Sequence, residues 1–168
     1  HRTIVSQAWY ALCIGMISAM AEHTRAAEYF RGGEREVSIL WNDPQTDLLC
    51  KARIDSLQQS ARRITDLKTT EDASAFEWSV KRYCYYRQAA FYVDGCRALG
   101  LDIDEFCIVA AEKRDPFGVR AAPMGAAEME AGREEYQELL GLIAECKHCD
   151  AWPGYEDPDA WRVPHLQR

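Results

Sequence analysis

Ile64-Thr-Asp-Leu-Lys-Thr-Thr70 is the most informative stretch of the sequence, because it alternates like a β-strand and carries two charged side chains. Residues two apart on a strand project from the same face, so Asp66 and Lys68 are expected to lie side by side. The preceding segment, 48–55, also has the pattern of a strand and ends at Asp55. Hairpin pairing of segments 48–55 and 62–69 brings Asp55 beside Asp66.

Two carboxylates beside an ammonium group are suited to a hard divalent cation and an attacking water. Magnesium prefers oxygen ligands and accepts a site with only one or two protein carboxylates. A lysine next to such an ion can orient or deprotonate the water, or meet negative charge that develops in the transition state. An Asp-x-Lys triplet is common, however, and taken alone it favours an ordinary ion pair on a surface strand.

The rest of the chain predicts a single α/β domain, residues 1–168, with helices packed on a sheet. A strand over 36–41 precedes the two just described, which makes three consecutive antiparallel strands. Ser6 is a suitable N-cap for a helix that ends before Gly32 and Gly33. The further expected elements are, in chain order, a helix over 7–30, a helix over 82–99, strands over 106–111 and 119–122, and a helix over 126–147. The segment from Asp150, with Trp152 and Trp161, is expected to cross the domain irregularly.

Composition indicates a globular protein and excludes a generally basic nucleic-acid coat. Hydrophobic residues make up 48% of the chain and charged residues 28%, with a net charge of −7. No apolar run is long enough for a membrane span, and no signal peptide is apparent, which predicts a cytoplasmic protein without membrane contact. Only the middle block, residues 51–97, is net positive, at +3, so we expect any phosphate-binding surface there.

The seven cysteines are odd in number and lie mostly in apolar or periodic segments, which favours reduced thiols over a disulfide framework. Cys146 and Cys149 have the spacing of half a zinc site. No second Cys or His pair accompanies them, so a structural role is favoured.

Several motifs occur together with Asp55 and the Asp66-Leu-Lys-Thr-Thr70 segment. They are Trp41-Asn-Asp-Pro-Gln-Thr46, Arg82-Tyr83, Gln88-Ala-Ala-Phe-Tyr92, Val109-Ala-Ala-Glu112, Glu145-Cys146 and Trp152-Pro-Gly-Tyr155. This set resembles the PD-(D/E)XK nuclease superfamily, and within it the RecE-type exonucleases (exonuclease VIII) of phages and prophages, over roughly residues 7–162. The resemblance implies a restriction-endonuclease-like fold, with a central mixed sheet flanked by helices.

The resemblance also implies the roles of individual residues. Asp55, Asp66 and the carbonyl of Leu67 would hold Mg²⁺, with Mn²⁺ as the alternative ion, and Lys68 would be the catalytic lysine. Gln88 and Tyr92 match a QxxxY motif that faces the active site and the DNA. Their i, i+4 spacing puts both on one helix face, which also fits plain packing.

The activity implied is processive, ATP-independent 5′-to-3′ hydrolysis of linear double-stranded DNA in phage-type recombination. A ring-shaped homo-oligomer and a single-strand annealing protein as partner are implied with it. Two alternatives stay open. The chain could be an endonuclease, because the same chemistry cleaves internally, or a non-catalytic DNA-binding or assembly module on a nuclease fold.

One feature of the family is expected to be absent. The resemblance places a further active-site His or Glu on a helix far upstream of Asp55, so the chain is expected to be a C-terminal fragment that lacks one ligand. His23 is expected to be a helix-end residue rather than its replacement. Six residues are candidate phosphate contacts, with a solvated surface as the equal alternative: Arg53, Arg62, Arg63, Lys81, Arg82 and Arg87. The aromatic residues Trp9, Tyr10, Trp78 and Tyr83 to Tyr86 are expected to be packing residues.

Overall fold

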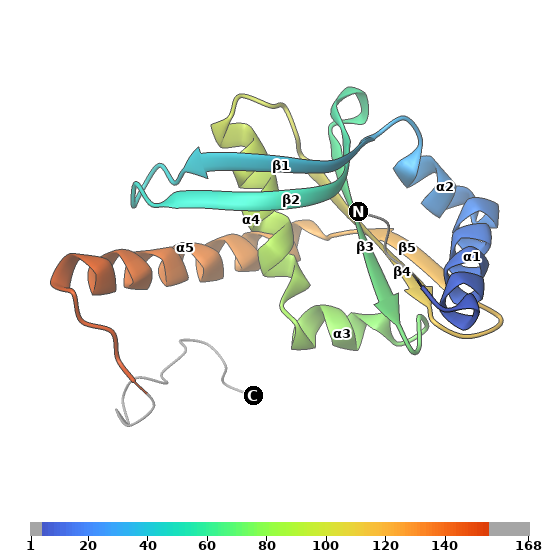
Figure 1. The fold of residues 1–168 in the computed structure, drawn as a ribbon. Coiled ribbons are helices and arrows are strands. Elements are labelled where there is room, and N and C mark those ends of the chain that lie inside the picture. The colour runs from blue at the N-terminus through green and yellow to red at the C-terminus, as the bar shows by residue number, and fades with distance from the viewer. Residues whose placement is uncertain (1–4, 155–168) are drawn as a thin grey trace.

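A computed structural model describes residues 5–154, which form a five-stranded sheet with helices on both faces (Figure 1). The strands lie in the order β1-β2-β3-β4-β5. In chain order the elements are α1 (Gln7–Glu22), α2 (Thr24–Phe30), β1 (Glu34–Asn42), β2 (Leu49–Gln58), the 3-10 turn η1 (Gln59–Ala61), β3 (Arg63–Thr70), α3 (Phe76–Arg82), α4 (Tyr85–Ala98), β4 (Glu105–Glu112), β5 (Val119–Pro123) and α5 (Ala126–Cys149). The predicted α/β fold with a mixed sheet is confirmed.

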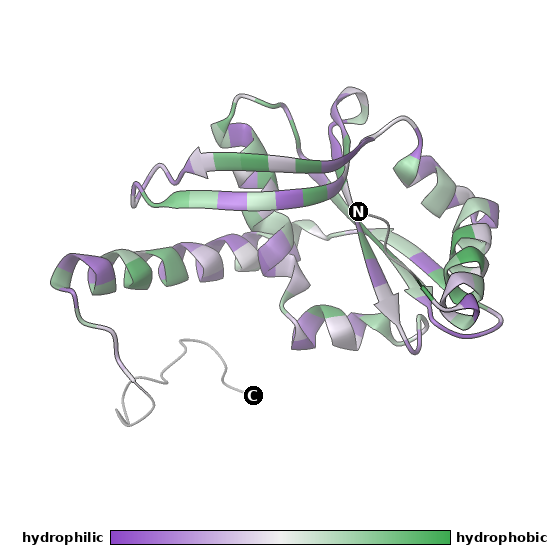
Figure 2. Ribbon diagram, viewed as in Figure 1, coloured by the Kyte–Doolittle hydropathy of each residue, from purple (hydrophilic) through white to green (hydrophobic). Residues whose placement is uncertain are grey.

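The sheet is mixed because β3 pairs differently with its two neighbours. It runs antiparallel to β2 and parallel to β4, and β1–β2 and β4–β5 are antiparallel pairs. The three consecutive antiparallel strands predicted from alternation are therefore confirmed. Hydrophobic and hydrophilic residues alternate visibly along β2 (Figure 2). In contrast, β4 is buried at every position from Phe106 to Ala111, as expected of an interior strand.

Each face of the sheet has its own hydrophobic core. The larger core lies between the sheet and α4, where Ile54, Ile64 and Phe106 are almost completely buried and Val93 of α4 packs among them. The smaller core lies on the opposite face beneath α1 and α2, and is made by Ala26, Tyr29, Cys107, Val109 and Ala121. Alternate residues of β4 thus serve the two cores, which fixes the direction of every side chain on this strand.

The helix expected over residues 7–30 is two helices, because the chain turns at His23. This residue has an extended backbone, and its N–H donates to Ala19 O and so ends α1. Its Nδ1 accepts from Ala26 N at 3.2 Å and so caps α2. The turn lets Ala26 and Tyr29 reach the smaller core, whereas α1 has no buried residue. The N-cap at Ser6 is confirmed, since its side chain accepts from Trp9 N.

The single long helix expected to contain residues 82–99 is two helices. α3 occupies Phe76–Arg82, and α4 begins only at Tyr85. Between them Cys84 has φ of 51°, a left-handed conformation that ends a helical path. The periodicity of side chains continues across this break, so the pattern of apolar residues gives no sign of it.

Four of the aromatic residues expected to be packing residues are exposed, which corrects that prediction. Trp9 and Tyr10 are exposed on α1, and Trp78 and Tyr83 are exposed on α3 and just after it. Tyr85 and Tyr86 do pack: the Tyr85 ring stacks on Phe76, and the Tyr86 hydroxyl donates to Glu135 at 2.9 Å. Within residues 5–154, none of the helices combines the length and hydrophobicity needed to cross a membrane.

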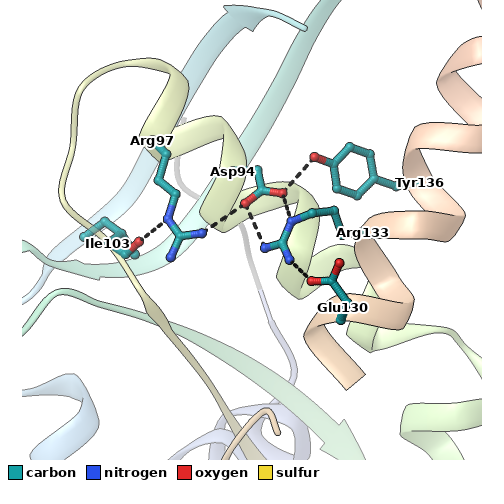
Figure 3. A network of polar contacts seen from close by, with 6 residues as sticks. All are labelled: Asp94, Arg97, Ile103, Glu130, Arg133 and Tyr136. Atoms are coloured by element: carbon teal, nitrogen blue, oxygen red, sulfur yellow. Dashed lines mark hydrogen bonds and ion pairs between the residues drawn. The ribbon is translucent and has the colours of Figure 1, made fainter. Parts of the chain in front are cut away.

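α5 is fastened to α4 by a close helix contact and a polar network. A side chain at Gly132 would meet the backbone carbonyl oxygen of Tyr86 at 2.3 Å, so only glycine fits there. Beyond this contact, Arg133 donates two hydrogen bonds to Asp94 at 2.7 and 3.0 Å (Figure 3). The Tyr136 hydroxyl donates to the same carboxylate at 2.8 Å. Asp94 on α4 is therefore held by two side chains of α5.

We expect Gly132→Ala to lower the free energy of unfolding by about 1–3 kcal/mol, because the added methyl group would overfill the contact between α4 and α5, where its nearest neighbours are backbone atoms. Gly141→Ala in the same helix is the matched control, since its side chain would enter open space. That control should stabilise the protein by about 1 kcal/mol through helix propensity. Urea denaturation measures both, and equal effects would contradict a close contact between α4 and α5 at Gly132.

Candidate nuclease site

The candidate site lies where β2 and β3 separate. Their ladder consists of Gln58 with Arg63, Leu57 with Ile64, and Ser56 with Thr65. The same register continued by one residue would place Asp55 opposite Asp66, but the ladder ends there. Beyond this point the Asp55 side chain, and not the β2 backbone, bonds to β3: its Oδ2 accepts from Leu67 N at 2.8 Å. Asp55 thus stands at a fork in the sheet, beside the start of the Asp66-Leu-Lys68 segment.

Asp66, Lys68 and Gln88 form one hydrogen-bonded group on the α4 side of β3. The ammonium nitrogen of Lys68 lies 2.5 Å from Asp66 Oδ2. The side-chain amide of Gln88, on α4, donates to Asp66 Oδ1 at 2.7 Å and accepts from Lys68 Nζ at 3.0 Å. The predicted placement of Asp66 and Lys68 on one face is therefore what the structure has, with Gln88 joined to both.

Two tyrosines of α4 complete the surroundings of this group. Lys68 Nζ lies 4.7 Å from the centre of the Tyr85 ring, over its face, where the ring attracts a cation. Tyr92 lies one helical turn beyond Gln88, and its ring packs edge-on against Phe106. Burial and the nearby Asp66 carboxylate raise the pKa of the Tyr92 hydroxyl. The sequence predicts only a packing role for Tyr85, although its position three residues before Gln88 places it on the same helix face.

The Asp66 carboxylate is in an environment that resists ionisation. Asp66 is only 4% exposed. Burial raises the pKa of its carboxyl above the ordinary value of 3.8, and the Asp55 carboxylate raises it further. Lys68 and Gln88 act in the opposite direction. Within residues 5–154, Asp66 Oδ2 has no hydrogen-bond partner of suitable geometry despite the nearby ammonium group. A second positive charge at this oxygen would relieve the cost of its burial.

The donor atoms at the fork fit a hard divalent cation. They are the carboxylates of Asp55 and Asp66, and Asp66 brings a buried, underbonded oxygen. The N–H and C=O of one strand residue point towards the same neighbouring strand. The Leu67 carbonyl therefore faces the fork, as its N–H does. In the described part of the chain, no group of three or more His, Cys, Asp and Glu side chains is placed to hold a metal ion. Magnesium accepts so small a protein ligand set because it retains water.

An open groove reaches the fork from the opposite face of the sheet. It has a volume of about 830 Å³ and is lined mainly by apolar side chains of α1 and α2, including Ile17, Met20 and Phe30. Asp55, Leu67, Arg31 and Arg35 also line it. The fork is therefore accessible from this groove.

The candidate phosphate contacts are mostly engaged within the protein. Arg53 pairs with Glu36 at 2.6 Å, Arg62 pairs with both Asp102 and Asp104 at 2.9 Å, and Arg87 pairs with Glu135 at 2.6 Å. Arg63 forms a bond to Glu105 and lies over the Tyr29 ring. For Lys81 and Arg82, both on α3, no ion pair is found within residues 5–154.

Other residues considered from the sequence lie away from the fork. His23 caps two helices, as expected of a helix-end residue, and lines a separate depression with Arg25 and Arg120. Cys146 and Cys149 are free thiols in the last turns of α5. Tyr155 and Trp161 lie outside the described residues.

The mixed sheet, the separated strands and the Asp55, Asp66 and Lys68 side chains define a protein of PD-(D/E)XK type. Comparison with family models gives the particular family: residues 2–163 match the PDDEXK-like domain of unknown function DUF3799, and the chain belongs to this family.

One solved structure similar to this chain agrees on the fold. A protein from Eubacterium rectale, whose structure is described as that of a candidate exonuclease, superposes with a TM-score of 0.74 at 18% identity. The match covers 96% of this chain but 63% of the other, so this chain spans less than two thirds of that protein. The structure of SSO0001 matches with a TM-score of 0.40 at 17% identity, over 84% of this chain and 64% of the other. A comparison with curated proteins finds no match.

We expect the wild type to lose stability relative to Asp66→Asn as the pH rises. A raised carboxyl pKa means that the folded protein binds a proton more tightly than the unfolded chain. The stabilisation is then complete below about pH 3.8 and is lost as the pH rises through the higher folded pKa. Urea denaturation of both proteins between pH 4 and pH 7, with a chelator present, measures the difference. A constant difference, or one that favours the wild type at higher pH, would contradict the burial of an ionised Asp66.

Proposed function

We propose that this chain is a metal-dependent nuclease that hydrolyses phosphodiester bonds of DNA at the fork between β2 and β3. The observation that carries the proposal is the group formed by Asp66, Lys68 and Gln88 beside Asp55. A surface ion pair of the ordinary kind would be solvated and would have no need of an amide bonded to both partners. Here the Asp66 carboxylate is buried, and the Lys68 ammonium contacts both Asp66 and Gln88. A second carboxylate, that of Asp55, lies at the adjacent fork.

The residues divide the chemistry between them. Asp55, Asp66 and the Leu67 carbonyl would hold Mg²⁺, or Mn²⁺, which when bound polarises a phosphoryl oxygen and acidifies its water. Lys68 would orient the attacking water or meet the charge that develops on the phosphate. Gln88 is a positioning residue, because it holds Lys68 Nζ and Asp66 Oδ1 in fixed relation. Tyr92 would face the DNA from the next turn of α4, as the QxxxY resemblance implies.

The finer features of the activity rest on the resemblance to RecE-type exonucleases. We propose that residues 1–168 act as one nuclease domain on linear double-stranded DNA, with 5′-to-3′ polarity, in phage-type recombination. A homo-oligomeric ring, a single-strand annealing protein as partner and a cytoplasmic location belong to the same proposal. The description of the Eubacterium rectale protein as a candidate exonuclease agrees with end-dependent cleavage.

A non-catalytic DNA-binding or assembly module on the same fold is the alternative of another class. It is favoured by the small ligand set, since the described residues bring only two carboxylates to the fork. The test therefore has to measure cleavage and binding separately. End-labelled linear DNA and closed circular DNA of the same sequence, incubated with Mg²⁺ or with chelator, distinguish the possibilities. Loss of the linear form alone indicates an exonuclease, loss of both an endonuclease, and binding without loss the module.

We expect Lys68→Ala to lower the cleavage rate by ~100-fold or more while the protein stays folded and binds DNA, the scale expected when an acid–base or electrostatic participant is removed. Lys147→Ala is the matched control, because Lys147 is an exposed lysine near the end of α5. Single-turnover rates at saturating Mg²⁺ measure the effect. An unchanged rate for Lys68→Ala would make Lys68 an ordinary surface lysine and remove the main support for catalysis here.

A further inference from the structure

The surface formed by Trp78, Lys81, Arg82 and Tyr83, here called the α3 surface, combines exposed aromatic rings with cations. Trp78 is 77% exposed and Tyr83 is 60% exposed, although the exposed area of such large rings is costly in water. Positions 78, 81 and 82 are related by three and four residues, so they share one face of α3. Tyr83 follows at the end of this helix. Two aromatic rings and two cations therefore lie together in solvent.

The cations of the α3 surface are free of ion pairs inside the described part of the protein. The candidate basic residues Arg53, Arg62, Arg63 and Arg87 are each matched to carboxylates. Lys81 and Arg82 have no such match within residues 5–154, and the Arg82 guanidinium lies over the Tyr83 ring at 5.9 Å. In a chain with a net charge of −7, this is a positive patch whose charge is not neutralised by the fold.

The α3 surface is connected to the candidate site through a single side chain. The rings of Tyr83 and Tyr85 lie with their centres 5.6 Å apart. The Tyr85 ring also contacts Lys68, whose ammonium lies 4.7 Å from the ring centre. The break between helices α3 and α4 at Cys84 allows these contacts. It leaves Tyr83 exposed, whereas Tyr85 is the first residue of α4. A polymer that leaves the site beside Lys68 would therefore meet Tyr83 first, and then the rest of the patch.

We propose that the α3 surface binds a single-stranded stretch of DNA next to the bond that is cleaved, with bases stacked on Trp78 and Tyr83 and phosphates held by Lys81 and Arg82. Exposed rings combined with cations are the means by which proteins bind single strands without sequence preference. Paired bases in a duplex have no free face for such rings, which selects the single strand. The proposal rests on the proposed nuclease function and adds the form of the substrate that the site receives.

Equilibrium binding tests the proposal without cleavage. The probe is a fluorescein-labelled oligo(dT) strand, added to the whole chain with chelator present and followed by fluorescence anisotropy. Trp78→Ala and Tyr83→Ala should each weaken binding by ~5-fold or more, which is the scale of one lost base stack. Trp9→Ala is the matched control, because Trp9 is 65% exposed on α1 and far along the chain from α3. Its affinity should equal that of the wild type.

The cations are tested through the salt dependence of the same binding. Lys81→Gln and Arg82→Gln should each lower the slope of log affinity against log salt by about 0.7, the value for one contact to a single strand. Lys147→Gln, an exposed lysine of α5, should leave the slope unchanged. Circular dichroism and thermal melting establish whether every variant is folded. We expect all of them to fold, because the substituted side chains are exposed.

The outcomes separate this proposal from the proposed function. Unchanged oligo(dT) affinity in Trp78→Ala and Tyr83→Ala, with both variants folded, would overturn the role of the α3 surface even if the protein cleaves DNA. Equal losses in Trp9→Ala would do the same, since they would show that binding is not localised. An absence of cleavage by the wild type with Mg²⁺ would instead overturn the nuclease function, while the binding data would still decide whether α3 holds single strands.

Discussion

The side-chain amide of Gln88 holds the centre of this domain together, because it joins a buried carboxylate and an ammonium on β3 to the helix that covers them. An ionised carboxylate in the protein interior is costly unless it is paired and hydrogen-bonded. Gln88 donates to Asp66 and accepts from Lys68, and this one amide therefore satisfies groups of opposite character. A glutamate at this position would offer only acceptors and would repel Asp66, and a leucine would leave both charges without the bond.

The position of Gln88 in turn depends on how α4 is held. Val93 and Ala89 pack α4 on the sheet, and Gly132 lets α5 approach α4 closely from the outer side. The bonds from Arg133 and Tyr136 to Asp94 fix the far end of α4 (Figure 3). The polar group at the fork thus rests on regular elements with buried contacts, which is the arrangement that keeps functional side chains within narrow limits of position.

Much of this arrangement follows from patterns in the sequence, and the remainder has identifiable causes. Alternation predicted the three antiparallel strands, and the two-residue spacing of Asp66 and Lys68 predicted their common face. Two helix breaks were missed, at His23 and Cys84, because each depends on the backbone angles of one residue while the apolar periodicity continues.

Contacts between side chains far apart in sequence are harder to predict than the ends of helices. The ion pairs of Arg62 with Asp102 and of Arg87 with Glu135 join residues 40 or more positions apart, so no local pattern reveals them. The exposure of Trp78 and Tyr83 is not predicted for the same reason. Their residue type favours packing, and only the tertiary structure decides which aromatic residues find a partner.

The fork in the sheet has a thermodynamic consequence. Asp55 belongs to the β1–β2 hairpin and Asp66 to the β3–β4 half of the sheet, and only three residue pairs join β2 to β3. The two carboxylates therefore lie on different strands of the pairing with the fewest residue pairs, β2 with β3. They repel each other across this pairing when both are ionised. A cation bound to both carboxylates would link β2 to β3. Its binding free energy would also stabilise the pairing of the two halves, so that folding and ion binding would each depend on the other.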